Sequence, residues 1–438
     1  MSSATMSDTR QFQDDFEAID ASSPLADMRR EAFERFHELG WPTTRSEAWR
    51  YTNLRPLTAA NLSMAPSTSV DKTIIEPYFI EDAQVHRIVF VNGRFDDGLS
   101  DIGQLPKGVT VGHLSDAVEE NASAVLAHLG STFDWKADAL DALNTAFIED
   151  GLYIHVPTNT ELDQPVHVLH VTVTDPAVAV VTHPRTLIVV EDGSRATCIE
   201  SCFGTGDAMC LVNPVTEIIA GHGAHVDHYR EVREGEQTWH LGTLGVTQGN
   251  DGQVNSCCLA LEGKVIRNAM IGTLEGTDAM ANLRGLAWGT GDRHIDNFLR
   301  VNHMKPDCNS REYFKHILDD SSTASFTGRI YVEQDAQKTD AVQTNRNLLL
   351  NEKTKVYTRP QLEIFADDVK CTHGATIGRL DEDARFYLEA RGIGREAANS
   401  LLIFAFANEV IEDIAFEPLR SRLETILLDR LPDGGMFR

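Results

Sequence analysis

The spacing of hydrophobic residues changes twice along this chain. Near the N-terminus, apolar residues recur every three or four positions, which predicts amphipathic helices between residues 9 and 40. The second of these is expected to begin at Ser23-Pro24 and to end at Gly40. Residues 114–150 have the same texture, and the run RIVFVNGRF between them predicts a strand followed by an Asn-Gly turn.

Residues 152–380 follow a second pattern, in which short apolar runs alternate with Gly, Asp and Asn. Runs such as LYIHV, PVHVLHVTV, TLIVVED, ATCIES and KVYTRPQLEIFA are rich in β-branched and aromatic residues, which predicts strands. More than 200 residues of this texture are too many for one small sandwich. A large barrel, a double sandwich or a solenoid of stacked rungs would each accommodate them, and no clean short repeat decides among the three.

Helical spacing returns toward the C-terminus. The segment REAANSLLIFAFANEVIEDI predicts an amphipathic helix, and Pro418 begins a second one. The apolar face of the first helix consists of Ile403, Phe406, Val410 and Ile414. We expect both helices to pack on the β-rich core rather than on a partner. The changes of pattern divide the chain into a mostly helical domain with a short β segment (1–150), a β core (151–381) and a helical domain (382–438).

The sequence is strongly acidic, with 66 Asp and Glu against 39 Lys and Arg in 438 residues and a formal net charge of −27. This balance argues against a nucleic-acid-binding protein and against a protein of anionic membrane surfaces, because both need basic patches for phosphate. The sequence MSSATMSDTRQFQDDFEAID has no basic start and no apolar run, so neither a secretory signal nor a transit peptide is expected. Seven cysteines without a CxxC pair are typical of a reducing compartment, and a cytoplasmic protein is predicted.

The common catalytic motifs are missing from the sequence, which has no phosphate-binding loop, no GxSxG and no HExxH. The segment GHGAHVDHY instead offers His222, His225 and His228, with Asp227 between them. On a strand, His225 and Asp227 share a face while His228 points the other way. A cupin-like metal-dependent enzyme is therefore one hypothesis, although the HxH pair and spaced Glu of such sites are not present. The other is a surface or packing role for these histidines, in a structural β-solenoid without metal.

Cys371 and His373, in PQLEIFADDVKCTHGATIG, form the second candidate site. Two residues apart on a strand, their side chains project from the same face, and a thiolate beside an imidazole suits iron, zinc or copper(I). A closed site needs about four ligands, and no other Cys or His lies nearby in the sequence. Two interpretations stay open. One is half of a metal site completed from far along the chain or from another subunit, and the other is a turn in which Asp367, Asp368 and His373 make local hydrogen bonds beside a buried Cys371.

The run AQKTDAVQTNRNLLLNEKTKVYTRPQLEIFADDVKCTHGATIGRLDEDARFYLEARGI, from Ala336 to Ile393, is long and specific. With this run the chain resembles the SufB/SufD family of iron–sulfur cluster assembly scaffolds. RSEAWRYTNLRPL, from Arg45, is similar to the pattern that SufD chains carry before their β domain, and HGAT at 373–376 resembles SufD, where SufB chains tend to have HEAT. FKHILDD at 314–320 departs from the family, in which Lys-Gly-(Val/Ile)-Leu is common.

The resemblance implies a mainly β fold, a right-handed parallel β-helix core flanked by N-terminal and C-terminal α-helical domains. It implies a scaffold rather than an enzyme. Such a chain pairs with a SufB-like subunit, binds a SufC-like ABC ATPase through its C-terminal helical domain, and belongs to a complex that passes iron–sulfur clusters to acceptor proteins. Whether it forms a homodimer in the absence of SufB is left open.

The resemblance also assigns residues. His373 matches the SufD histidine at the SufB interface, and Cys371 matches the neighbouring family cysteine. With them we place Asp367, Asp368 and Gly374 in the partner interface. A transient iron–sulfur cluster is expected between the two subunits, with no stably bound cofactor in the isolated chain.

Overall fold

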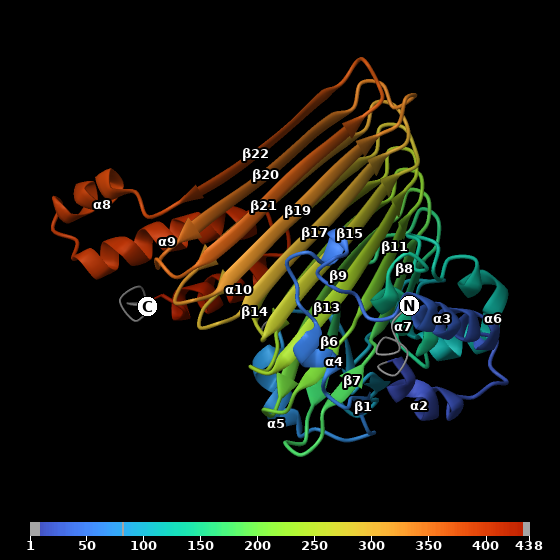
Figure 1. Ribbon diagram of the computed structural model, residues 1–438. Helices are drawn as coiled ribbons and strands as arrows, with labels where there is room; N and C mark the ends of the chain where they lie inside the picture. The colour runs from blue at the N-terminus through green and yellow to red at the C-terminus, as the bar shows by residue number, and fades with distance from the viewer. Residues whose placement is uncertain (1–8, 81–82, 432–438) are drawn as a thin grey trace.

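The computed structural model describes residues 9–80 and 83–431 and is mostly β, with 40% strand against 23% helix. Two sheets of parallel strands face each other, and the chain passes from one to the other on each turn (Figure 1). The result is a β-solenoid of about eight turns with helices near both ends of the chain. The solenoid is one of the three architectures that the strand pattern allowed, and it confirms the fold that the family resemblance implied.

The first sheet, sheet A, has twelve strands, nine of them in the order β21-β19-β17-β15-β13-β11-β8-β5-β4. Its members from β5 onward are β5 (Leu152–Val156), β7 (Val180–Thr182), β8 (Arg185–Val190), β10 (Cys210–Val212), β11 (Val215–Ala220), β13 (Thr238–Gln248), β15 (Val265–Leu274), β17 (His294–His303), β19 (Thr323–Val332) and β21 (Lys355–Ile364).

The second sheet, sheet B, has ten strands in the order β22-β20-β18-β16-β14-β12-β9-β6-β2-β3. Its members from β6 onward are β6 (Val166–Val173), β9 (Arg195–Thr205), β12 (His225–Arg233), β14 (Gln253–Glu262), β16 (Met280–Gly289), β18 (Asn309–Leu318), β20 (Asp340–Leu349) and β22 (Lys370–Gly378).

The rungs differ in length, which explains why no clean repeat stands out in the sequence. Residues that occupy equivalent places on successive rungs of sheet B are 28, 27, 29, 31 and 30 positions apart. They are His225, Gln253, Met280, Asn309, Asp340 and Lys370. Turns of varying length absorb the difference, so no single fixed period fits the sequence.

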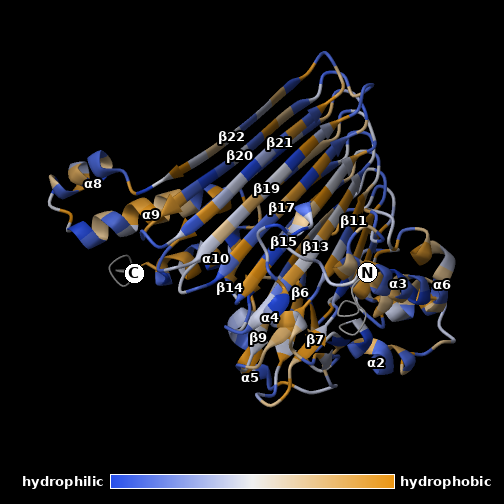
Figure 2. Ribbon diagram, viewed as in Figure 1, coloured by the Kyte–Doolittle hydropathy of each residue, from blue (hydrophilic) through white to orange (hydrophobic). Residues whose placement is uncertain are grey.

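Side chains along each strand point alternately into the solenoid and out of it. Hydrophobic and hydrophilic positions alternate along the strands of the upper rungs (Figure 2), because successive side chains point to opposite faces. The inward residues of both sheets form one apolar interior, which includes Val168, Ile218, Leu244, Leu283, Phe314 and Phe326. Six of the seven cysteines are buried, as expected of small apolar filler, and all seven are free thiols.

A buried polar network lies within this interior around Glu200. Its carboxylate accepts hydrogen bonds from Thr186 Oγ1 at 3.0 Å, Thr216 Oγ1 at 2.9 Å, His228 Nε2 at 2.8 Å and Arg230 Nε at 2.9 Å. Burial alone would raise the pKa of Glu200, but Arg230 and the neighbouring imidazoles of His170 and His228 hold it well below its usual range. The network is therefore an ion pair whose remaining lone pairs are satisfied.

Short elements close the N-terminal end of the solenoid. The first 113 residues contribute η1 (Arg10–Phe12), α2 (Gln13–Glu17), α3 (Ala26–Leu39), η2 (Glu47–Trp49), α4 (Arg55–Thr58), β1 (Ser63–Met64), α5 (Lys72–Ile75), η3 (Glu76–Tyr78), β2 (His86–Val91), β3 (Arg94–Phe95) and β4 (Thr110–His113). The predicted Asn-Gly turn is confirmed, since Asn92 and Gly93 both have positive φ, and it joins the antiparallel strands β2 and β3 into a hairpin. Helices α6 (Leu114–Leu126) and α7 (Ala139–Ala146) follow, so the predicted helical segment 114–150 is interrupted after Leu126.

The predicted start of α3 is wrong by two or three residues. The helix begins at Ala26, and Ser23 lies in the preceding turn, where its Oγ accepts from the Leu25 amide at 3.3 Å. The predicted end is confirmed, since Gly40 has φ 64° and its amide closes the last turn.

Residues 46–54, which we call the strap, lie across the outer face of sheet A. Trp49 donates its indole N–H to Asp138 at 2.6 Å and packs under the guanidinium of Arg267. Further along, Tyr51 stacks on Tyr357 of β21 with ring centroids 4.8 Å apart. The strap thus joins the N-terminal region to the last strand of sheet A.

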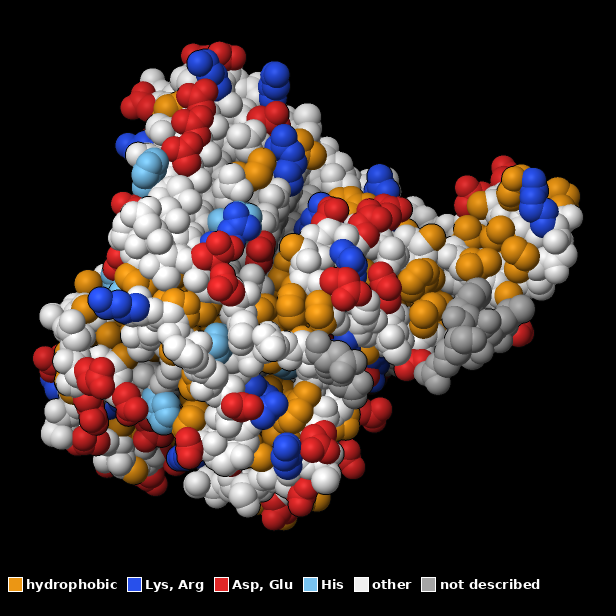
Figure 3. Space-filling view, turned by 180° about the vertical axis from the view of Figure 1, so that it is seen from behind, with side chains coloured by type: hydrophobic (Ala, Val, Ile, Leu, Met, Phe, Trp, Pro, Cys, Tyr) orange, Lys and Arg blue, Asp and Glu red, His pale blue; other side chains and the backbone are white. Residues whose placement is uncertain are grey.

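The C-terminal helices are α8 (Glu382–Glu389), α9 (Arg395–Ile411) and α10 (Glu417–Asp429). The buried faces of α9 and α10 pack on the outer face of sheet B, which confirms that they cover the core. This cluster includes Tyr229, Leu259, Ile317, Ile403, Val410, Leu419 and Leu423. Helix α8 instead projects from the body and displays hydrophobic side chains at the right of Figure 3. No helix in residues 9–80 and 83–431 combines the length and apolarity needed to cross a bilayer.

Candidate functional site at the open end of the solenoid

The two ends of the solenoid differ. At the N-terminal end, the antiparallel strands β3 and β4 terminate the two sheets. At the other end, β21 and β22 are the outermost strands, and each pairs with a neighbour on one side alone (Figure 1). Their free edges carry unpaired backbone N–H and C=O groups, which can pair with another chain.

Apolar side chains are concentrated at this open end. Four of the eight large hydrophobic residues that are exposed among the described residues lie on β21, on β22 or in the loop between them. They are Tyr357, Ile364, Phe365 and Ile377, and we call them the open-end patch. Exposed apolar patches of this kind mark interaction sites on soluble proteins.

Cys371 and His373 both lie on β22, as the sequence predicted. They pair with Ala341 and Gln343 of β20, whose side chains are buried in the interior. Paired residues of a parallel sheet face the same way, so the thiol and the imidazole face the inner side of the last rung. His373 is exposed because no rung covers it, whereas Cys371 packs partly against the interior beside Ala341. Burial raises the pKa of the Cys371 thiol.

No third ligand joins this pair, since no group of three His, Cys, Asp or Glu side chains converges in the described residues. Asp367 and Asp368 are exposed in the loop before β22, and the Asp368 amide donates to Gln337 Oε1 at 2.9 Å. Gly374 follows His373 on the strand, with open space where a Cβ would project. The thiol and the imidazole therefore lie on an uncovered edge of the solenoid, without a third candidate ligand among the described residues.

Two residues that the sequence does not single out lie beneath His373. Gln343 is one strand inward and Glu312 of β18 is the next, so the three form one column along the inner face of sheet B. Gln343 Nε2 donates to Glu312 Oε2 at 2.6 Å. His373 and Gln343 are 30 positions apart in the sequence, and Gln343 and Glu312 are 31 apart, which is the length of one rung. A search at the rung length would therefore have identified these two residues from the sequence.

Glu312 makes the stability of the fold depend on pH. Burial raises its pKa to about 8, so the folded chain keeps the carboxyl protonated over a range in which the unfolded chain has ionised it. The unfolded state then binds fewer protons, and stability falls as pH rises from about 5 to 8. As the pH rises across this range, we expect the free energy of unfolding of Glu312→Gln to increase relative to that of the wild type. The increase reaches about 3 kcal/mol, since one pKa unit corresponds to about 1.4 kcal/mol. Urea unfolding of both proteins at pH 5.5 and pH 8 measures the gain, and an equal difference at the two pH values would contradict it.

The three histidines of GHGAHVDHY do not converge. His222 lies in a turn against the Asn250 carbonyl, and His225 faces outward with its Nε2 3.2 Å from Asp227 Oδ1. His228 points inward to Glu200. The predicted split of faces is confirmed, and it separates the imidazoles that a cupin-like site would have to bring together.

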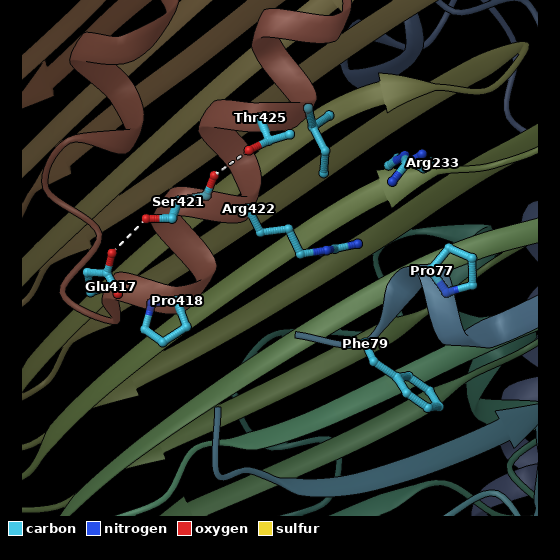
Figure 4. A pocket seen from close by; sticks show the side chains of 9 residues that line it. Pro77, Phe79, Arg233, Glu417, Pro418, Ser421, Arg422 and Thr425 are labelled. Carbon is cyan, nitrogen blue, oxygen red and sulfur yellow. Dashed lines mark hydrogen bonds between the residues drawn. The ribbon is translucent and has the colours of Figure 1, made fainter. Parts of the chain in front are cut away.

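A cavity of about 490 Å³ lies between η3 and α10 (Figure 4). Its charged side chains already have partners within the protein. Arg422 donates to Glu231 at 2.6 Å, Arg233 lies 3.5 Å from the same carboxylate, and Glu417 accepts from Ser421 at 2.6 Å. No residue of β21 or β22 lines this cavity, so it is separate from the open end.

Fold and site together define a solenoid scaffold with one uncapped end that displays a thiol and an imidazole. Comparisons with known proteins identify the family of the chain. The family description "SUF system FeS cluster assembly, SufBD core domain" matches residues 171–406, and "SufBD protein N-terminal region" matches residues 6–168.

The curated relatives lead to the same family. A Synechocystis protein described as an iron–sulfur cluster assembly SufBD family protein is 33% identical over 92% of this chain and 90% of its own length. The iron–sulfur cluster assembly protein SufD of Escherichia coli is 31% identical over 90% of both chains. SufD of Bacillus subtilis is 26% identical over 92% of this chain and 93% of its own. The chain belongs to the SufBD family of iron–sulfur cluster assembly proteins, and it is SufD-like.

Proposed function

We propose that this chain is a non-enzymatic subunit of a complex that builds iron–sulfur clusters, and that it pairs end to end with a SufB-like subunit. The observation that carries the proposal is the uncapped last rung. Two unpaired strand edges, the open-end patch and a two-residue half-site occupy the same end of the solenoid. A solenoid needs a cap at each terminus, and a partner rung stacked on β21 and β22 supplies one.

In this arrangement the nascent cluster is cargo held between two chains. His373 contributes one ligand through a ring nitrogen, Cys371 lies beside it, and thiolates of the second subunit complete the set. Asp367, Asp368 and Gly374 flank the half-site and lie in the interface. Acceptor proteins then receive the cluster. In the absence of a SufB-like subunit, the same edges are available to a second copy of this chain.

The C-terminal helical domain is the docking region for a SufC-like ABC ATPase, which would hydrolyse ATP. Helix α8 projects from the body with Phe386 and Tyr387 exposed at 70% and 56%. Helix α9 is coupled to the rungs near the open end, because Glu409 accepts from Tyr313 at 2.6 Å and pairs with Lys315 at 2.7 Å. A movement of the ATPase can therefore reach β18 through α9.

Replacing Phe365 by Asp is expected to weaken pairing with a SufB-like subunit about thirtyfold or more. An ionised carboxylate buried in an apolar interface costs at least as much as removing a hot-spot side chain, about 2 kcal/mol. The measurement is titration calorimetry of the purified chains, with size-exclusion chromatography of the mixture. Val178→Asp is the matched control, because Val178 is 45% exposed in a loop before β7, away from β21 and β22.

End-to-end pairing would be refuted if Phe365→Asp bound like the wild type, or if Val178→Asp weakened binding equally. If the wild-type chain fails to co-purify with both a SufB-like subunit and an ABC ATPase after co-expression, the role as a subunit of such a complex is wrong.

A further inference from the structure

The column beneath His373 contains an acceptor without a donor. Gln343 is buried, and its Oε1 has no hydrogen-bond partner among the described residues. Buried carbonyl oxygens are nearly always paired in folded proteins, because leaving one unpaired is unfavourable. The next rung outward is β22, and the residue in register with Gln343 is His373.

Two neighbours determine the position of the Gln343 amide, one on the rung beneath it and one on the facing sheet. Its nitrogen donates to Glu312 Oε2 at 2.6 Å on the rung beneath, while Gln343 Oε1 and Glu312 Oε1 have no hydrogen-bond partner among the described residues. On the facing sheet, Gly328 of β19 leaves the room that the amide occupies, and a Cβ at that position would clash with Gln343 Nε2. The amide is therefore held in place before any ligand arrives.

Histidines that bind metal almost always donate their second ring N–H to an acceptor, which fixes the tautomer and aims the other nitrogen at the metal. The His373 side chain receives no hydrogen bond or ion pair from the described residues, so its second ring nitrogen is available. On the neighbouring rung, Gln343 Oε1 is the hydrogen-bond acceptor that a metal-binding histidine requires.

We propose that Gln343, held by Glu312, is the positioning residue of the open end. Its Oε1 accepts the ring N–H of His373 and leaves the other imidazole nitrogen facing the space in which the cluster forms. This inference rests on the proposed function for the identity of the cargo. The structure shows no hydrogen bond between Gln343 and His373, so the exposed imidazole must turn toward Gln343 Oε1, which it can do in the isolated chain.

The test uses the full-length chain labelled with ¹⁵N-histidine, with the signals of His373 assigned from a His373→Gln sample. We expect one neutral tautomer of His373 with an observable ring N–H proton in the wild type. In Gln343→Met, which keeps the length of the side chain but removes the acceptor, we expect averaged tautomers and no such proton. Cluster loading in the reconstituted complex should fall about tenfold or more, as for other residues that orient metal ligands.

Asn347→Leu is the control, because Asn347 is also a buried inward residue of β20 but pairs with Ile377. It should leave the His373 signals and the loading unchanged. Gln343→Asn, which withdraws the oxygen by one methylene, repeats the test if Gln343→Met does not fold.

Unchanged His373 signals in the Gln343 variants would overturn the proposal. An equal loss of cluster loading in Asn347→Leu would show that Gln343 has only a structural role, and this result would also overturn the proposal. If His373→Ala loads clusters normally while the ¹⁵N result holds, the proposed function fails and the contact stands, so the two failures are distinguishable.

Discussion

Glu200→Ala is expected to destabilise the protein by about 3–5 kcal/mol, the range measured when one partner of a buried ion pair is removed. Arg230 would remain in the interior without a countercharge, and its side chain is 3% exposed. His228 and the hydroxyl groups of Thr186 and Thr216 would lose their acceptor in the same step. Urea unfolding followed by circular dichroism measures the loss.

Glu191→Ala is the matched control for this prediction. Glu191 also accepts from a histidine and a threonine, His155 Nε2 at 2.8 Å and Thr158 Oγ1 at 2.8 Å, but its side chain is 42% exposed. Exposed ion pairs contribute about 1 kcal/mol or less, so a small loss is expected. Equal losses in the two variants would show that burial of Glu200 does not determine its contribution.

His373→Ala is expected to reduce cluster formation about tenfold or more while changing the stability of the isolated chain by about 1 kcal/mol or less, the net contribution of one hydrogen bond. The imidazole is exposed at the last rung, so its removal creates no cavity. As a proposed ligand, however, it contributes at least as much as the residues that orient ligands, whose loss costs about 10–100-fold. The experiment combines the variant with a SufB-like subunit, an ABC ATPase, iron, a sulfide source and ATP, and follows the visible absorbance of the cluster.

His225→Ala provides the comparison, since His225 also lies on a strand of sheet B but faces outward beside Asp227. It should assemble clusters like the wild type. Normal assembly by His373→Ala would remove His373 from the site. Tightly bound stoichiometric metal in the isolated wild-type chain, lost in His225→Ala, would favour the cupin-like enzyme instead.

The sequence predicted turns, helix ends and amphipathic helices well, because their conformation depends on residues that are near one another in the sequence. The hairpin at Asn92-Gly93 and the end of α3 at Gly40 depend on backbone conformations that few residue types adopt. The amphipathic faces of α9 and α10 required an apolar surface, and sheet B provides it. The strands β13, β15, β16, β17, β18 and β20 did not stand out, because polar inward residues such as Asn297 and Glu312 interrupt their apolar patterns.

The candidate site was predicted in part. Spacing alone placed Cys371 and His373 on one face of a strand, and the structure confirms this. It did not reveal that this face is the inner side of the last rung, or that Gln343 and Glu312 lie beneath it. Those neighbours are 30 and 61 positions away in the sequence, and they meet His373 through the register of three parallel strands.

The sequence by itself determined the chemical components: a thiol and an imidazole two residues apart, a strand-rich middle and helices near both ends. Which end of the solenoid stays open was decided by the tertiary structure alone, because it depends on where antiparallel strands and helices cover the sheets. The tertiary structure also buried His228 in the packed interior and left His373 exposed. Both imidazoles face the same interior column, but further rungs are stacked over His228 and none over His373.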